Sequence, residues 1–133
     1  YVKFIDNFPD ACQLGRKGQN FLLSCEDSLI ARLAYPLGYY CSYQPALKLK
    51  HYMKKDRFRL NYLMRLMEGY GSSYIILEKI LGRSFETPSL LNSITSLCIK
   101  LIWRVMTIGR AGFIIWFWDL GYNCQLRKAD KFQ

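Results

Sequence analysis

Asp119 is the acidic residue whose sequence surroundings suggest a special role. It directly follows Phe113–Trp118, a run made only of Phe, Ile and Trp. A carboxylate beside such a run costs free energy at membrane depth unless a cation pairs with it, and ionisable groups at that depth are commonly functional. Asp119 is therefore a candidate for an intramembrane ion pair. Alternatively, it marks the point where a helix emerges into the headgroup zone, or it pairs with a cation on a neighbouring chain.

The other residues that commonly carry catalysis form no recognisable set. His51 is the only histidine, and it lies among lysines, where a surface role is more usual than general-base catalysis. The sequence has no Ser-His-Asp set, no H-E-x-x-H motif and no Walker loop. Its five cysteines, an odd number without a C-x-x-C pair, indicate free, buried thiols rather than a zinc site or a disulfide framework. We expect no enzyme activity, no cofactor and no metal.

The segment that contains Asp119 is permissive for a helix over about forty residues. Thr87 can cap its start, and Pro88 suits the first helical position, where its missing N–H costs nothing. Most of the segment is too apolar for an ordinary surface helix. The sequence therefore predicts a long hydrophobic, membrane-associated helix over about 88–126.

Three cations interrupt this predicted helix. At 100° per residue, Lys100, Arg104 and Arg110 fall on one side, opposite a mostly apolar face. This pattern is typical of a helix at a membrane interface, whose long cationic side chains reach headgroups or a protein partner. The alternative is the central helix of a soluble bundle, with the Lys and Arg stems laid over its rim.

The apolar run before Asp119 is the predicted point of deepest membrane contact. It lies between charged residues and is long enough to enter one leaflet without crossing the bilayer. Nearby, Gly109 and Gly112 would let another helix approach closely. The predicted membrane-contacting residues are Phe113, Ile114, Ile115, Trp116, Phe117 and Trp118.

Composition and charge limit the classes of partner. The 133 residues suffice for one domain, and 51% are hydrophobic and 16% aromatic, while the formal net charge is +9. A chain that is both apolar and strongly basic suits a partner that combines apolar and anionic groups. Membrane lipid, or a large assembly that contains lipid or RNA, has this character.

Most of the net charge lies in one short stretch. Residues 48–65 carry seven Lys or Arg against a single acidic residue, Asp56. Apolar residues recur there near helical spacing, which predicts a basic amphipathic helix over about 46–68 that ends at Gly69 or Gly71. Lipid phosphates, RNA phosphates and acidic protein surfaces all suit its cations. The predicted contacts with lipid or an anionic partner are Lys48, Lys50, Lys54, Lys55, Arg57, Arg59 and Arg65, together with Lys100, Arg104 and Arg110.

The remaining elements complete an all-α prediction. Residues 1–10 indicate an irregular N-terminal arm, and residues 127–133 a short basic C-terminal tail. Ser24 and Asp27 have the spacing of a capping box and open a further helix. A third short helix or buried turn is predicted over 72–81. Together the elements predict one helical domain that spans residues 1–133.

The order of several features resembles the peroxin-11 family, which elongates peroxisomal membranes. The resemblance rests on Val2-Lys3-Phe4, Arg57-Phe58-Arg59-Leu60 and the run Phe113–Asp119, which stand in a similar order. Asn61 replaces the family's Gly, Leu120 stands where Asn usually follows the Asp, and the early Gly-Arg-Asp-Lys pattern is absent. The resemblance implies that Lys54–Arg59 would insert a basic amphipathic helix into an anionic leaflet and bend it.

These features favour a structural role in a membrane. We expect an accessory subunit of a large organellar complex, most plausibly a respiratory-chain or ATP-synthase assembly of the mitochondrial inner membrane, that contacts anionic phospholipid and other subunits. The second hypothesis is a protein that shapes membranes at the peroxisome, like peroxin-11. The third is a mitoribosomal protein that binds RNA through the basic stretch, although no RNA-binding fold signature is present.

Overall fold

The computed structural model describes residues 22, 24–35, 38–40 and 42–130. Within these ranges the chain is all-helical, as the sequence predicts, and contains no strand. The predicted N-terminal arm and residues 131–133 lie outside the described residues. The elements are α2 Glu26–Ala34, the 3₁₀ helix η3 Lys55–Phe58, α3 Leu60–Ile80, α4 Leu90–Ile108 and α5 Arg110–Asp130.

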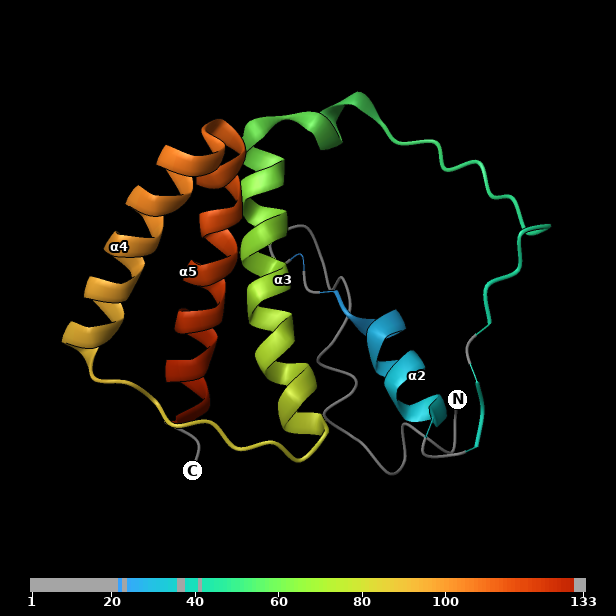
Figure 1. Cartoon of the computed structure of the whole chain (residues 1–133), viewed down its shortest axis with the longest axis horizontal. Helices are drawn as coiled ribbons and strands as arrows, with labels where there is room; N and C mark the ends of the chain where they lie inside the picture. The colour runs from blue at the N-terminus through green and yellow to red at the C-terminus, as the bar shows by residue number, and fades with distance from the viewer. Residues whose placement is uncertain (1–21, 23, 36–37, 41, 131–133) are drawn as a thin grey trace.

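The three long helices stand in a row with α5 in the middle (Figure 1). α3 packs along one side of α5 and α4 along the other, while α2 lies beyond α3. α4 is therefore the edge of the row, and one of its long sides faces away from the other helices.

Small residues bring the backbones of α3 and α5 into contact. A Cβ atom at Gly71 would overlap the carbonyl oxygen of Trp118, and one at Gly121 would overlap the carbonyl oxygen of Glu68. The hydroxyl of Ser72 donates a hydrogen bond to the Gly121 carbonyl at 3.1 Å. Close approach at small residues, with hydroxyls bonded to backbone, is common between helices in membranes.

α2 joins the row through an apolar cluster and a buried carboxylate. Leu29 packs with residues 76, 77 and 80 of α3. Glu78, whose side chain is 0% exposed, pairs with Arg32 of α2 and, at 2.8 Å, with Arg83. The hydrogen bond to Glu78 raises the pKa of Arg32 above its ordinary value. This clamp fixes α2 against the C-terminal end of α3.

The start of α2 differs from the predicted capping box. The N-cap is Cys25, at φ 79°, and no side chain caps the helix. The backbone N–H of Ser24 instead donates to Ser73 Oγ at 2.8 Å, which ties the entry of α2 to α3. Burial is the main cause that raises the pKa of the Cys25 thiol.

The predicted long helix over 88–126 is two helices joined by a tight turn at Gly109. Gly109 has φ 62°, a backbone conformation that residues with a Cβ rarely adopt. The chain reverses there, so α4 and α5 lie side by side (Figure 1). α4 begins with Ser89 as its N-cap, which accepts the Asn92 N–H at 3.2 Å, rather than with Thr87.

Only the second half of the segment 46–68, which is predicted as a basic helix, is α-helical. Residues 46–54 are extended or in a turn, η3 forms a single 3₁₀ turn, and α3 begins only at Leu60. Two physical reasons account for the difference. Like charges one turn apart, such as Lys50 with Lys54 and Lys55 with Arg59, destabilise a helix. Within residues 24–35 and 42–130, no other element packs on the apolar side chains of this stretch, which are exposed.

α3 also continues past its predicted end. Gly69 and Gly71 lie inside the helix, and the predicted separate element over 72–81 is its second half. The glycine that follows the true end is Gly82, at φ 79°. The two inner glycines serve close packing instead, and Gly69 lies against the Leu22 backbone.

We expect Gly71→Ala to destabilise the fold. Helix propensity alone would raise the free energy of unfolding by about 1 kcal/mol. Overlap with the Trp118 carbonyl must separate α3 from α5, so we expect a net loss of about 1–3 kcal/mol. Chemical denaturation in mild detergent, followed by circular dichroism, measures it. Asn61→Ala, at an exposed position of the same helix, is the matched control, and an equal response of the two variants would contradict the packing role of Gly71.

Candidate functional site

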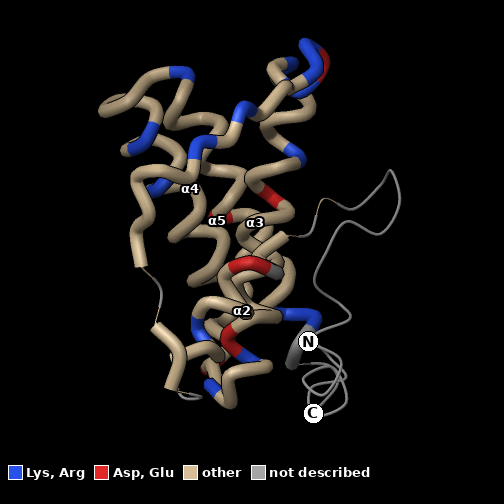
Figure 2. Tube along the Cα trace, turned by 90° about the vertical axis from the view of Figure 1, so that its right-hand side faces the viewer, with Lys and Arg blue, Asp and Glu red and all other residues tan. Residues whose placement is uncertain are grey.

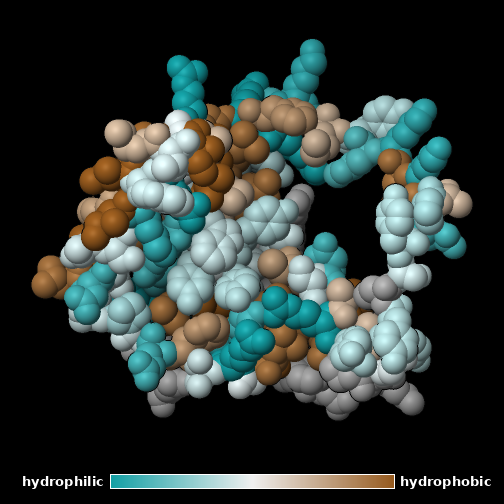
Figure 3. Space-filling view, in the orientation of Figure 1, coloured by the Kyte–Doolittle hydropathy of each residue, from teal (hydrophilic) through white to brown (hydrophobic). Residues whose placement is uncertain are grey.

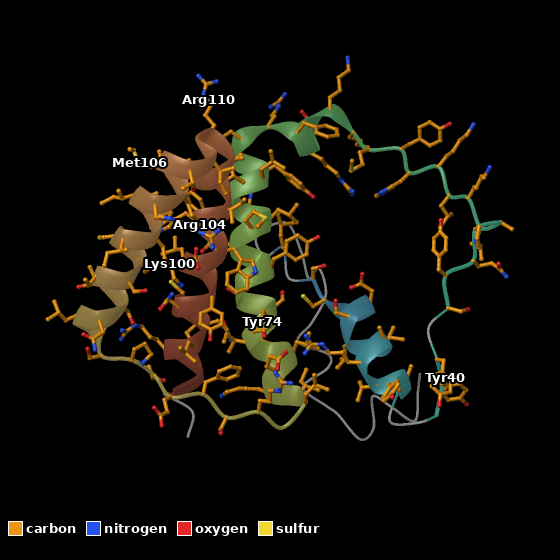
Figure 4. The ribbon with its side chains drawn as sticks, viewed as in Figure 1. Tyr40, Tyr74, Lys100, Arg104, Met106 and Arg110 are labelled. Atoms are coloured by element: carbon orange, nitrogen blue, oxygen red, sulfur yellow. The ribbon has the colours of Figure 1, made fainter. Side chains whose placement is uncertain are left out.

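The outer side of α4 is an uncovered apolar surface. Ile102 is 65% exposed and Met106 81% exposed, although both are large apolar residues. Met106 points away from α5 (Figure 4), and hydrophobic residues gather over α4 at the left of the molecule (Figure 3). We call this surface the α4 face, and its members are Leu91, Ile94, Cys98, Ile99, Ile102, Trp103, Val105 and Met106.

The inner side of α4 carries its charges. Lys100 Nζ lies 3.1 Å from Asp119 Oδ1, and Arg104 Nε lies 2.8 Å from Asp119 Oδ2. The Asp119 side chain is 2% exposed, so α5 holds a nearly dry carboxylate that pairs with both cations of α4. Lys100 and Arg104 lie on the side of α4 that faces α5 (Figure 4). Two cations share one carboxylate, and the cluster carries a net positive charge.

Further polar contacts join the same two helices. Trp116 Nε1 donates to the Leu97 carbonyl at 2.9 Å. Near the other end of the pair, an Arg127 guanidinium nitrogen donates to Ser93 Oγ at 2.7 Å and to the Ser89 carbonyl at 3.1 Å. α4 therefore docks on α5 largely through polar groups.

α4 is an amphipathic helix whose apolar side faces outward, the opposite of what is usual in soluble proteins. A surface helix in water buries its apolar side and exposes its polar side, whereas α4 turns its two cations toward α5 and exposes large apolar side chains. In the part of the chain that the structure describes, α4 is also the helix long and apolar enough to cross a membrane. Its 19 residues would span about 28 Å, close to the thickness of the hydrocarbon core.

The predicted run Phe113–Trp118 lies mostly inside the row. Phe113 is 36% exposed, and residues 114–118 are half-buried between α4 and α3. Because the chain reverses at Gly109, this run packs against neighbours within the same chain. The most exposed apolar surface belongs to the preceding helix, where the sequence predicts an apolar face of the kind found at a membrane interface but names none of its residues as the deepest membrane contact.

An aromatic cluster lies between α3 and α5. Trp118 and Tyr122 stack with ring centroids 5.4 Å apart, and Tyr74 lies 5.8 Å from Trp118 and 6.2 Å from Tyr122. Burial is the main cause that raises the pKa of the Tyr122 hydroxyl. The cluster adds packing between α3 and α5 beyond their small-residue contacts.

The predicted cations form two groups. Lys100 and Arg104 point inward to Asp119, so they do not lie on the outward stripe that the sequence predicts. Arg110 lies beyond the Gly109 turn and is exposed, at the end of the row where η3 lies; Lys and Arg positions gather at that end (Figure 2). The others are exposed except Arg57, which is half-buried: Lys48, Lys50, Lys54, Lys55, Arg57 and Arg59 before α3, and Arg65 on it.

Residues 46–59, which we call the basic arm, lie away from the α4 face. The arm runs along the far side of α3 and α2 from α4 (Figure 1). Leu49 and Tyr52 are 88% and 87% exposed, so the arm presents apolar and cationic side chains together.

The three cysteines among the described residues form no disulfide. Cys25, Cys98 and Cys124 are free, as the sequence predicts for them. The prediction that they are buried is wrong for Cys98 and Cys124, which are exposed. In the described ranges no group of three His, Cys, Asp or Glu is placed to hold a metal ion.

No protein-family model, curated protein or solved structure matches this chain. The resemblance to peroxin-11 thus remains a hypothesis based on a few short motifs.

We expect Asp119→Ala to lower the free energy of unfolding by about 3 kcal/mol. The loss of one partner from a buried ion pair typically costs about 3–5 kcal/mol, and the half-exposed Lys100 can turn to water, which favours the lower end. Denaturation of the detergent-solubilised chain measures the change. Glu86→Ala, at an exposed carboxylate, is the control.

A triple variant separates charge from packing. Lys100→Met, Arg104→Met and Asp119→Leu together replace the cluster by apolar side chains, and such replacements are often neutral or stabilising. We expect stability within about 1 kcal/mol of the original chain. If Asp119→Ala matched the original chain in stability, the cluster would not hold α4 on α5.

Proposed function

We propose that this chain is a non-enzymatic, membrane-associated structural protein whose α4 face contacts lipid acyl chains. The observation that carries the proposal is the inverted polarity of α4. Its cations turn to a carboxylate inside the protein, whereas Ile102 and Met106 face outward.

The energetic case rests on what surrounds the α4 face. Full burial of a Leu, Ile or Met side chain is worth about 1.5–3 kcal/mol, so a face of several such residues is costly in water. Contiguous apolar patches of this kind mark membrane or protein contact sites. Small-residue packing of α3 on α5 and polar docking of α4 on α5 are the contacts that hold helices together where the surroundings are apolar.

The basic arm gives the protein a second surface of different chemistry. It lies on the opposite side of the row from the α4 face, so one molecule presents an apolar surface and a cationic surface in different directions (Figure 1). An anionic partner, such as the acidic surface of a neighbouring subunit, complements the arm. This arrangement supports an accessory subunit that holds neighbours together at a membrane.

The proposed setting is a large complex of an organellar membrane, with the mitochondrial inner membrane as first choice. The free thiols and the net charge of +9 favour a reducing compartment with anionic partners. The alternative function is membrane shaping like that of peroxin-11, which the Arg57-Phe58-Arg59-Leu60 stretch, exposed except at Arg57, favours. RNA binding by the arm is the third choice.

Vesicle flotation tests the lipid contact. We expect the chain to float with vesicles of phosphatidylcholine and phosphatidylglycerol, and Ile102→Glu with Met106→Glu to weaken binding more than tenfold, because a fold-change of ten needs only about 1.4 kcal/mol. Ser42→Glu with Ser84→Glu changes the charge equally at exposed positions outside α4 and should float normally. Equal flotation of the two double variants, or none of the original chain, refutes the proposed lipid contact.

Charge reversal tests the second surface. With Lys54, Lys55, Arg57 and Arg59 all changed to Glu, we expect the chain to stay in the membrane fraction of its source cells but to leave a high-mass assembly on native gels. The charge-preserving variant, with Lys and Arg exchanged at these positions, should remain in the assembly. Co-migration of the reversed variant with the assembly at low salt would count against the proposed arm contact, because those charges should then matter most.

A further inference from the structure

The length of α4 allows two orientations in a membrane. Its 19 residues suffice to cross the hydrocarbon core, and they equally suffice to lie along one leaflet. The positions of the charged residues on α4 and on its neighbours distinguish the two orientations.

Lys100 lies close to the middle of α4. At the helical rise it is about 15 Å from the Leu90 end and about 12 Å from the Ile108 end. Its side chain is 47% exposed although it bonds to Asp119. If α4 crossed the bilayer, this ammonium group would sit near the centre of the hydrocarbon core, where charge is most costly.

The whole cluster adds to that cost. Lys100 and Arg104 share the single carboxylate of Asp119, so a crossing α4 would place a net positive charge at mid-depth. If α4 lies flat with its outer face toward the acyl chains, the same cluster lies on the side away from them, at the level of the phosphates.

The neighbours of α4 give an independent reason. α5 runs beside α4, and α3 runs beside α5, over a similar height (Figure 1). An α4 that crossed the bilayer would therefore take both other helices into it. α3 carries four charged side chains and α5 carries five, and among the described helices only α4 is long and apolar enough to span. A flat orientation immerses only the edge of the row.

The α4 face suits a flat orientation along its full length. Leu91 near the start, Ile99 and Ile102 in the middle and Met106 near the end are all exposed. A helix in the plane of a leaflet needs apolar side chains of this kind from one end to the other.

Given the proposed function, on which this inference rests, we infer that α4 lies in the plane of a single leaflet and does not cross the bilayer. Its outer face contacts acyl chains, and Lys100 and Arg104 lie at headgroup level. The occupant of the α4 face is thus the acyl-chain region of one leaflet, and both ends of α4 lie on the same side of the membrane.

Polarised infrared spectroscopy of the unmodified chain on oriented bilayers tests this orientation. The long helices lie side by side, so their amide dichroism reports the direction of the row (Figure 1). We expect their mean direction to lie near the bilayer plane. A mean direction near the bilayer normal, in a chain that floats with vesicles, overturns the inference and leaves the proposed lipid contact standing. A chain that does not float overturns both.

Sidedness of labelling gives a second readout. In a background with the five cysteines changed to Ser, Leu90→Cys and Arg110→Cys place a thiol at each end of α4. After addition to preformed sealed vesicles, both should react fully with an impermeant maleimide. Reaction at one end only after permeabilisation overturns the inference, and if the serine background does not fold, the dichroism of the unmodified chain decides.

Discussion

Asp119 holds α4 in place, because its carboxylate pairs with both cations of that helix. Without this group, Lys100 and Arg104 would face α5 with no opposite charge in the cluster. The free energy of α4 would then be lower with these two cations turned to water. The carboxylate therefore decides which way α4 is rotated about its axis. That rotation decides in turn that Ile102 and Met106 are exposed, so the apolar surface of the molecule follows from one buried charge.

The packing of the row is consistent with this division between a polar interior and an apolar edge. Gly71 and Gly121 let α3 and α5 approach until their backbones touch, and the Ser72 hydroxyl donates a hydrogen bond to the Gly121 carbonyl at that contact. Glu78 is buried at the opposite flank and is likewise neutralised by two arginines. Both buried carboxylates thus join different segments of the chain, one fixing α2 and the other α4. The positions of α2 and α4 in the row are therefore set more by charge pairing than by the shape of a large apolar core.

The sequence predicts the helical class and the special role of Asp119, but not the partners of that residue. Lys100 and Arg104 are correctly placed on one side of a helix. The sequence does not predict their pairing with Asp119, because a single helix over 88–126 puts Asp119 on the same rod, where it cannot turn back to meet them. Gly109 was the available signal for a turn, but its role depends on φ, which sequence periodicity does not report.

The basic arm shows the opposite kind of failure. Apolar spacing around Leu49 and Met53 indicates a helix, yet a short helix needs a packing surface, which the helices that the structure describes do not offer there. Tertiary contacts explain both differences. Packing of α4 on α5 accompanies the division of the predicted helix over 88–126, and the lack of a packing surface leaves the first half of the predicted helix over 46–68 without an α-helix. By contrast, α3 is longer than predicted because its inner glycines are used for contact with α5 instead of for termination.

The order of residues in the α4–α5 hairpin also has a consequence for biosynthesis. Lys100 and Arg104 are translated before Asp119, which follows Lys100 by 19 positions. While the nascent chain ends between them, α4 has two cations and no carboxylate, and neither of its sides has a suitable neighbour. The cationic side of α4 gains its partner, and the apolar side becomes the outer side, only when α5 has been synthesised and folds back at Gly109. Folding of this hairpin is therefore coupled to the synthesis of α5, because α4 alone has no carboxylate to pair with its cations.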